Sequence, residues 1–268
     1  MTARARSAAR AVLAVGLAAL LVGVFLDPYP IPSYWSLDEN HLRAVFLLVL
    51  GLACARGLTG RFASNRPGLD FAAITPALIA LGFTLYLPIH ATLPVPGSAS
   101  GDPRIGAGVA IALAGSLLFA SGALAAAQTA VTFDRRARPS RREAIVLIGV
   151  LTLAGSIWLE GGLRDQYTEG SSYWQAGKGL FLLLLALVCA IAVLGKLLSG
   201  RDAFDRAVHR LGLVAMGFAL NPVLGAAFGD WADLRAGAWL ALAGSILIVG
   251  ATTQVAGEKV ATHNRVFA

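Results

Sequence analysis

Eight apolar runs constrain the fold of this chain more than any other feature of its sequence. Each is close to the roughly 20 apolar residues that a helix needs to cross a bilayer. Hydrophobic residues make up 57% of the chain and charged residues 14%, against about 25% charged residues in ordinary soluble domains. A mean hydropathy of +0.70 excludes a water-soluble fold. The sequence therefore predicts an all-α, polytopic membrane bundle of about eight transmembrane helices. The runs cover residues 8–26, 42–58, 71–89, 105–130, 144–159, 180–198, 211–228 and 238–256.

The first run could also be read as a secretory signal, because three arginines precede it. No small-residue cleavage site stands before Asp27-Pro28-Tyr29-Pro30. We therefore expect an uncleaved first helix.

Lysine and arginine are distributed unevenly between the loops that alternate along the eight runs. With the N-terminus inside, the inner segments hold 17 of the 22 lysines and arginines, and the outer segments hold five together with nine carboxylates. Basic residues are retained on the cytoplasmic side of a membrane. The pattern predicts a multi-pass protein of the plasma (inner) membrane with both termini in the cytoplasm. The basic pI is then a topology signal, and it gives no reason to expect nucleic-acid binding.

The two halves of the sequence echo each other in order, which predicts a duplication. The halves, residues 1–132 and 133–268, are expected to form two four-helix membrane repeats. Because each has an even number of spans, both insert with the same orientation, as parallel repeats about an axis along the membrane normal. The matching segments are Ser33-Tyr34-Trp35 with Ser172-Tyr173-Trp174, Gly60-Arg61 with Gly200-Arg201, residues 80–86 with 215–221, Ala112–Ser116 with Ala241–Ser245, and Asp27 with Glu160.

Small residues recur every four positions in the last run of each half. One stripe holds Gly108, Ala112 and Ser116, and the other holds Gly237, Ala241 and Ser245. Small side chains let helix backbones approach closely in a membrane. We read the stripes as helix contacts, within the chain or with another membrane protein; lining a narrow cavity is the alternative.

Tyr86 and Asn221 are the polar residues placed deepest in the apolar runs, at equivalent positions of the two halves. A proline follows each, Pro88 and Pro222, and frees backbone carbonyls that a ligand can use. We take Tyr86 and Asn221 as candidate substrate-binding residues facing one central space. Proline kinks without any ligand are also common in membrane helices.

Two carboxylates, Asp27 and Glu160, complete the candidate substrate-binding set. They end the first and fifth runs at matching places on the outer side. A pair of acids at one mouth attracts cations, although ordinary solvated loop acids are the simpler interpretation.

The sequence carries no clear metal-binding or catalytic signature. The outer residues Asp38, Glu39, His41 and His90 lack the ligand spacing of a zinc site, so no metal site is predicted. No P-loop, dinucleotide fingerprint, nucleophile elbow or HExxH motif is present. No cofactor is expected.

Two functions remain open from the sequence, with membrane lipids as partners in both. The favoured one is a transporter-like or permease-like bundle for a small or lipid-like solute, based on the duplication and the polar positions beside prolines. The other is a non-catalytic accessory or structural subunit that binds another membrane protein through the small-residue stripes. A membrane-embedded enzyme is least favoured because no catalytic cluster appears.

Overall fold

The computed structural model describes the chain as a set of helices. The described residues are 3–25, 41–64, 68–92, 110–118, 141–159, 178–199, 202–226 and 236–266. The helices are α1 (Ala3–Phe25), α2 (His41–Ser64), α3 (Gly68–Thr92), α5 (Arg141–Gly155), α6 (Lys178–Ser199), α7 (Asp202–Ala226) and α8 (Ala236–Val266), with a short 3-10 helix η2 (Ser156–Trp158) continuing α5. Residues 110–118 form a further helical segment. The expected all-helical class is confirmed for these residues.

Three of the described helices are long and apolar enough to cross a membrane. These stretches are Gly179–Leu197 of α6, Arg206–Leu224 of α7 and Ala236–Thr253 of α8. Shorter apolar stretches lie at Ala14–Gly23, Ile74–Tyr86 and Glu143–Trp158. The helices support a membrane protein; the number of passes stays a prediction.

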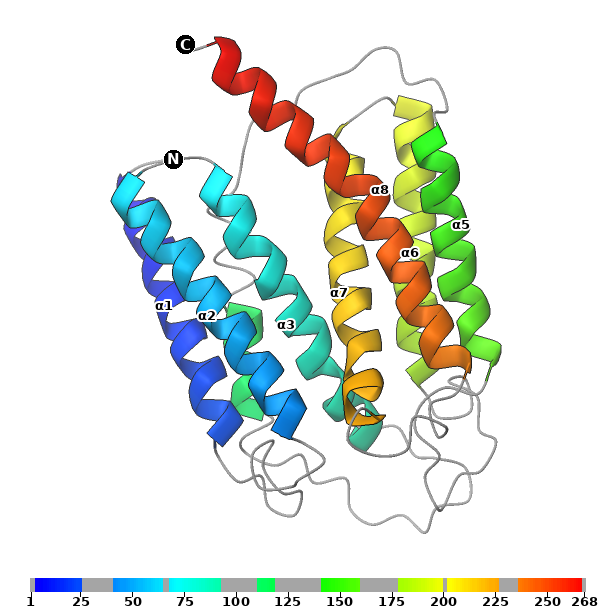
Figure 1. Cartoon of the computed structure of the whole chain (residues 1–268), viewed down its shortest axis with the longest axis horizontal. Helices are drawn as coiled ribbons and strands as arrows, with labels where there is room; N and C mark the ends of the chain where they lie inside the picture. Colours follow the sequence, from blue (N-terminus) through cyan, green and yellow to red (C-terminus); the bar gives the residue numbers. More distant parts are fainter. Residues whose placement is uncertain are drawn as a thin grey trace.

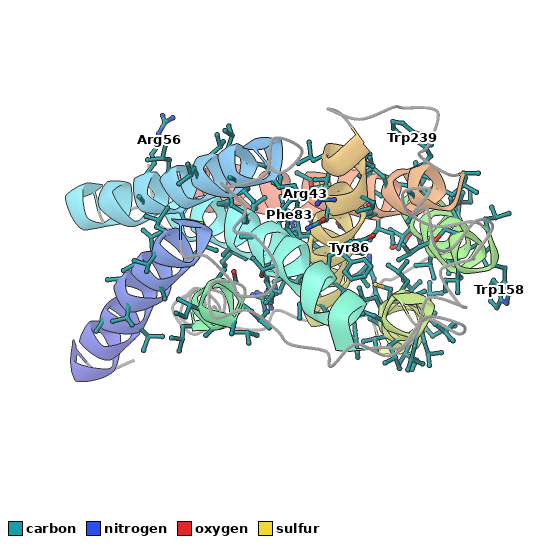
Figure 2. All side chains as sticks on the ribbon, turned by 90° about the horizontal axis from the view of Figure 1, so that it is seen from below. Arg43, Arg56, Phe83, Tyr86, Trp158 and Trp239 are labelled. Atoms are coloured by element: carbon teal, nitrogen blue, oxygen red, sulfur yellow. The ribbon has the colours of Figure 1, made fainter. Side chains whose placement is uncertain are left out.

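Several of the described helices expose large apolar side chains on their outer faces. On α6, Leu184, Leu187 and Ile191 are exposed, whereas Leu182 and Cys189 are fully buried. A helix that is apolar on every side suits a lipid environment. Trp158 and Trp239 also point outward, as Figure 2 shows, and such exposed tryptophans are typical of a membrane–water boundary.

The helices form two groups that meet along α3 and α7. Figure 1 shows α1, α2 and α3 on one side, and α5, α6, α7 and α8 on the other. α3 and α7 run side by side in the same direction and make the main contact between the groups. α1 begins and α8 ends at the same end of the bundle (Figure 1).

Two glycines allow α3 and α7 to touch backbone to backbone. A Cβ atom added at Gly82 would overlap the carbonyl oxygen of Val214, and one added at Gly217 would overlap the carbonyl oxygen of Ile79. Gly82 lies beside the backbone nitrogen of Phe218 and Gly217 beside that of Phe83, so the contact is reciprocal. Any larger residue at either glycine would push the two groups of helices apart.

Burial repeats along the chain at nearly constant spacing. Every residue of 44–56 in α2 falls in the same exposure class as the residue 135 positions later in α6. The same spacing relates α3 to α7, where 11 of the 13 residues in 74–86 agree with their counterparts in 209–221. A spacing of 133 relates α1 to α5 in the same way, and one of 129 relates residues 110–118 to α8.

Candidate functional site

Tyr86 lies inside the bundle, in a cluster of three aromatic rings just beyond the glycine crossing. Its side chain is 5% exposed. The ring packs on Phe218 of α7 with centroids 5.1 Å apart, and Phe181 of α6 packs on the same Phe218 at 4.8 Å. Tyr86 is therefore bundle-facing, and it contributes to the contact between the two groups of helices.

Asn221 lies inside the same contact and joins α7 to α3 through its side-chain amide. It is fully buried, and its Nδ2 donates to the carbonyl oxygen of Phe83 at 3.0 Å. Its Oδ1 has no hydrogen-bond donor among the described residues. An unsatisfied polar group costs several kcal/mol in a membrane interior, so this oxygen destabilises the crossing unless a partner binds it.

Arg43 brings a positive charge to Asn221 from the first turn of α2. Its Nε donates to the backbone carbonyl oxygen of Asn221 at 3.3 Å. Figure 2 shows Arg43, Phe83 and Tyr86 gathered in the middle of the molecule, contributed by α2 and α3. A cation near the end of α7 also suits the negative end of that helix dipole.

Pro222 adds to the polarity of this region because it stands inside α7. Proline has no N–H group, so it cannot donate to the carbonyl oxygen of Phe218 four residues earlier. Pro88 occupies α3, although its side chain is not among those described. The region around Asn221 therefore offers acceptor oxygens from both a side chain and a helix backbone.

The structure does not bring the four candidate substrate-binding residues together as a described set. Tyr86 and Asn221 lie at one helix contact, whereas Asp27 and Glu160 lie outside the described residues. Asp38 and Glu39 also lie outside them, and the side chains of His41 and His90 are not described. No group of potential metal ligands occurs in the part of the chain that is described.

The small-residue stripes face the interior of the chain. Ala112, Ser116, Ala241 and Ser245 are all buried; Gly108 lies outside the described residues. A Cβ added at Gly115 would overlap the backbone of α1 at Leu20, and one added at Gly244 would lie 2.7 Å from the Leu153 nitrogen of α5. The described members thus lie in contacts within the chain, and binding of another membrane protein through the stripes stays a prediction.

Several polar pairs between helices were not anticipated from the sequence. Glu143 of α5 and Lys196 of α6 form an ion pair at 2.6 Å. The hydroxyl oxygens of Thr84 and Ser116 lie 3.1 Å apart. His209 of α7 and Thr252 of α8 are joined at 2.8 Å between Nδ1 and Oγ1. The members of each pair are at least 32 positions apart, so no local sequence pattern links them.

The eight-span topology counts Arg43 among the five basic residues of the outer segments, and nothing in the sequence connects it to Asn221. Their separation of 178 positions hides the contact. One feature of the sequence hinted at this contact. Arg43 stands at the start of the run 42–58, and Asn221 stands in the second half of the run 211–228, which ends on the same predicted side. Comparisons with protein-family models, with curated proteins and with solved structures found no match to this chain.

Proposed function

We propose that this protein is a transporter-like multi-pass membrane bundle that binds a small or lipid-like solute where its two halves meet. The observation that carries the proposal is Asn221, a fully buried amide at the α3–α7 contact whose Oδ1 lacks a donor among the described residues. Polar groups inside a membrane protein are costly, and a buried one without a partner is a candidate for a substrate pathway.

Two tandem four-helix repeats in parallel orientation supply the framework of this proposal, comprising residues 1–132 and 133–268. Its support is the repetition of burial at spacings of 129 to 135 positions and the reciprocal contact of Gly82 and Gly217. Gly82 contacts the backbone of α7, and its counterpart Gly217 contacts the corresponding part of the α3 backbone. Such a reciprocal contact is the signature of a twofold interface. Parallel repeats place their shared axis along the membrane normal, between α3 and α7.

The eight-span topology of the plasma membrane, with both termini in the cytoplasm, is tested by labelling. Cysteines at Ser98 and Ser171 should react with an impermeant thiol reagent added outside intact cells, and a cysteine at Ser140 should not. Native Cys54 and Cys189 are buried, and both are replaced by alanine in this background. Labelling of the Ser140 position from outside rejects the topology.

Transport requires the α3–α7 contact to open, because Gly82 and Gly217 bring the two backbones together in this conformation. A solute pathway between the halves must then expose Tyr86 and Asn221 to water during the cycle. In membranes that contain the protein without its native cysteines, Tyr86→Cys and Asn221→Cys should react slowly with a small impermeant thiol reagent. Leu151→Cys on the outer face of α5 is the control, since a lipid-facing thiol stays unreactive.

An accessory or structural subunit is the second candidate, and the closeness of the glycine crossing favours it. Backbone contact of this kind makes a rigid junction, which suits a scaffold that never opens. Under this alternative Tyr86→Cys and Asn221→Cys stay unlabelled in membranes, while both react after denaturation. That result would move the assignment from transporter to subunit.

A further inference from the structure

His209 is an ionisable residue inside the bundle that the proposed pathway does not use. Its side chain is 7% exposed, and it lies in the apolar stretch Arg206–Leu224 of α7. The residue 135 positions earlier, Ile74, is 6% exposed. An apolar side chain therefore fills the equivalent place in the first half, so packing alone does not call for a histidine. Ionisable residues within membrane spans are costly, and they are candidates for proton relays.

The hydrogen bond between His209 and Thr252 of α8 determines which ring nitrogen carries the hydrogen. Nδ1 lies 2.8 Å from the Thr252 hydroxyl oxygen. That hydroxyl has one hydrogen, which it donates within α8 to the carbonyl oxygens of Ile248 at 2.7 Å and Val249 at 3.0 Å. If it donated to Nδ1 instead, two acceptor oxygens would face each other at 2.7 Å. Nδ1 of the neutral ring is therefore the donor, and Nε2 is the nitrogen that can take up a proton.

A proton on Nε2 would add a positive charge beside an arginine. Arg210 is close enough to His209 to interact with it electrostatically, and Arg206 interacts with Arg210 in the same way. The other charged side chains described at this end of the bundle are the Glu143–Lys196 pair and Arg56, which points outward (Figure 2). The acidic side chains of Asp70, Asp205 and Glu258, on α3, α7 and α8, are not described. Because Arg210 repels an imidazolium, protonation favours a conformation in which the ring lies nearer to water.

The position of His209 on α7 connects it to the glycine crossing. His209 and Asn221 stand toward opposite ends of α7, about 18 Å apart along its axis at about 1.5 Å per residue. Between them lies Gly217, which contacts the α3 backbone. Residues 209–217 form one helix before Pro222, so a movement of α7 against α8 also moves α7 against α3.

We propose that His209 is a proton-binding residue, whose Nε2 takes up a proton from water when α7 moves away from α8 and returns it to water when the helices close. The ring keeps its Nδ1–H group, so one N–H bond forms on uptake and the same bond breaks on release. A proton that binds the open conformation better shifts the population toward it. This rests on the proposed function, and it deepens it by naming the proton as the coupling ion of transport. A ligand of this size requires no preformed cavity.

The first measurement follows the histidine ring nitrogens of the purified full-length protein in detergent micelles. Nitrogen NMR of histidine-labelled protein is recorded from about pH 8 to about pH 5, where histidine changes its charge. The chain has four histidines, and His209→Ile, which copies the equivalent Ile74, identifies the signal of His209. That signal should show the Nδ1–H form at high pH and the imidazolium at low pH. A signal that stays neutral throughout, or that carries its hydrogen on Nε2, overturns the proposal.

A second variant identifies the signal if His209→Ile does not fold. Thr252→Val removes the acceptor of the Nδ1–H group and should change the nitrogen shift of His209. Thr253→Val is the matched control, because the exposed Thr253 hydroxyl donates to the Val249 carbonyl oxygen of its own helix. It should leave the His209 signal as in the native protein.

The second measurement asks whether the proton moves the pathway. Tyr86→Cys and Asn221→Cys, in the background without native cysteines, are labelled in membranes at several pH values, with and without His209→Ile. The ratio of rates in the two backgrounds cancels the pH dependence of the thiol itself. This ratio should rise in favour of native His209 as the pH falls, by at most about tenfold per pH unit, the limit for one linked proton.

Failure of this proposal and failure of the transporter assignment give different results. Titration of His209 without labelling of either cysteine at any pH upholds the proton site and rejects the transporter. Labelling with the same ratio at every pH upholds the pathway and overturns the coupling role of His209.

Discussion

The Tyr86 and Asn221 sides of the α3–α7 crossing share a backbone plan but differ in chemistry. Both have a glycine in backbone contact and a pair of packed phenylalanines. One side is closed by a third ring, and the other holds a buried amide oxygen without a donor among the described residues. The comparison teaches that residues whose burial matches can carry different roles, because burial fixes where a side chain lies and leaves its chemistry free.

The largest expected effect comes from adding a methyl group to either glycine of the crossing. Gly82→Ala and Gly217→Ala should each destabilise the protein by at least about 3 kcal/mol, because overpacking against an unyielding backbone exceeds the usual cost. Unfolding in mixed micelles measures it. Gly155→Ala and Gly250→Ala are the controls, since an added Cβ there meets nothing within 4 Å. Markedly unequal losses at Gly82 and Gly217 would break the equivalence of the two sides.

The contacts inside each half should come next. Ser116→Leu and Ser245→Leu place a large side chain at buried positions and should cost about 1 to 3 kcal/mol each. Thermal unfolding in detergent provides the measurement, and Ile246→Leu on the exposed face of α8 serves as the control. If both serine variants retain native stability, these positions line open space and not a packed contact.

A smaller effect is expected from the ion pair in the second half. Glu143 and Lys196 lie 2.6 Å apart and are 10% and 18% exposed. Glu143→Gln should lower stability by about 1 to 2 kcal/mol, since a hydrogen bond between charged groups is lost. A double-mutant cycle with Lys196→Met measures the coupling. Strictly additive losses would mean that the pair contributes no interaction energy.

The smallest effect sharpens the contrast between Thr84 and the residue 135 positions later, Ala219. Thr84→Ala removes the hydroxyl that lies 3.1 Å from the Ser116 oxygen and should cost about 1 kcal/mol. Thr152→Ala is the control, because that hydroxyl bonds only within its own helix. A loss at Thr84 no larger than at Thr152 would show that the bond between helices adds nothing, as on the Ala219 side.

The apolar runs anticipated the helices, and the duplication together with residue polarity anticipated the inward direction of Tyr86 and Asn221, which the structure shows as buried. It did not anticipate the helix boundaries, since α7 begins at Asp202 and α8 continues to Val266, well into charged segments. Charged residues carry no penalty in a helix that leaves the apolar layer, so hydropathy stops short of the true ends. Arg43 is a further example, because it stands at the start of an apolar run in α2 and its side chain reaches the Asn221 backbone in α7.

What the sequence determined by itself is the class of molecule: apolar runs near bilayer length leave helices as the only stable form, because every backbone group must be satisfied within its own segment. Which helix faces meet was decided only by the tertiary structure. Where described helices expose large apolar side chains as well as bury them, hydropathy cannot separate the two kinds of surface. Helices in a membrane then associate through close fit. Gly82 and Gly217 therefore read as ordinary small residues in the sequence and as the junction of the molecule in the fold.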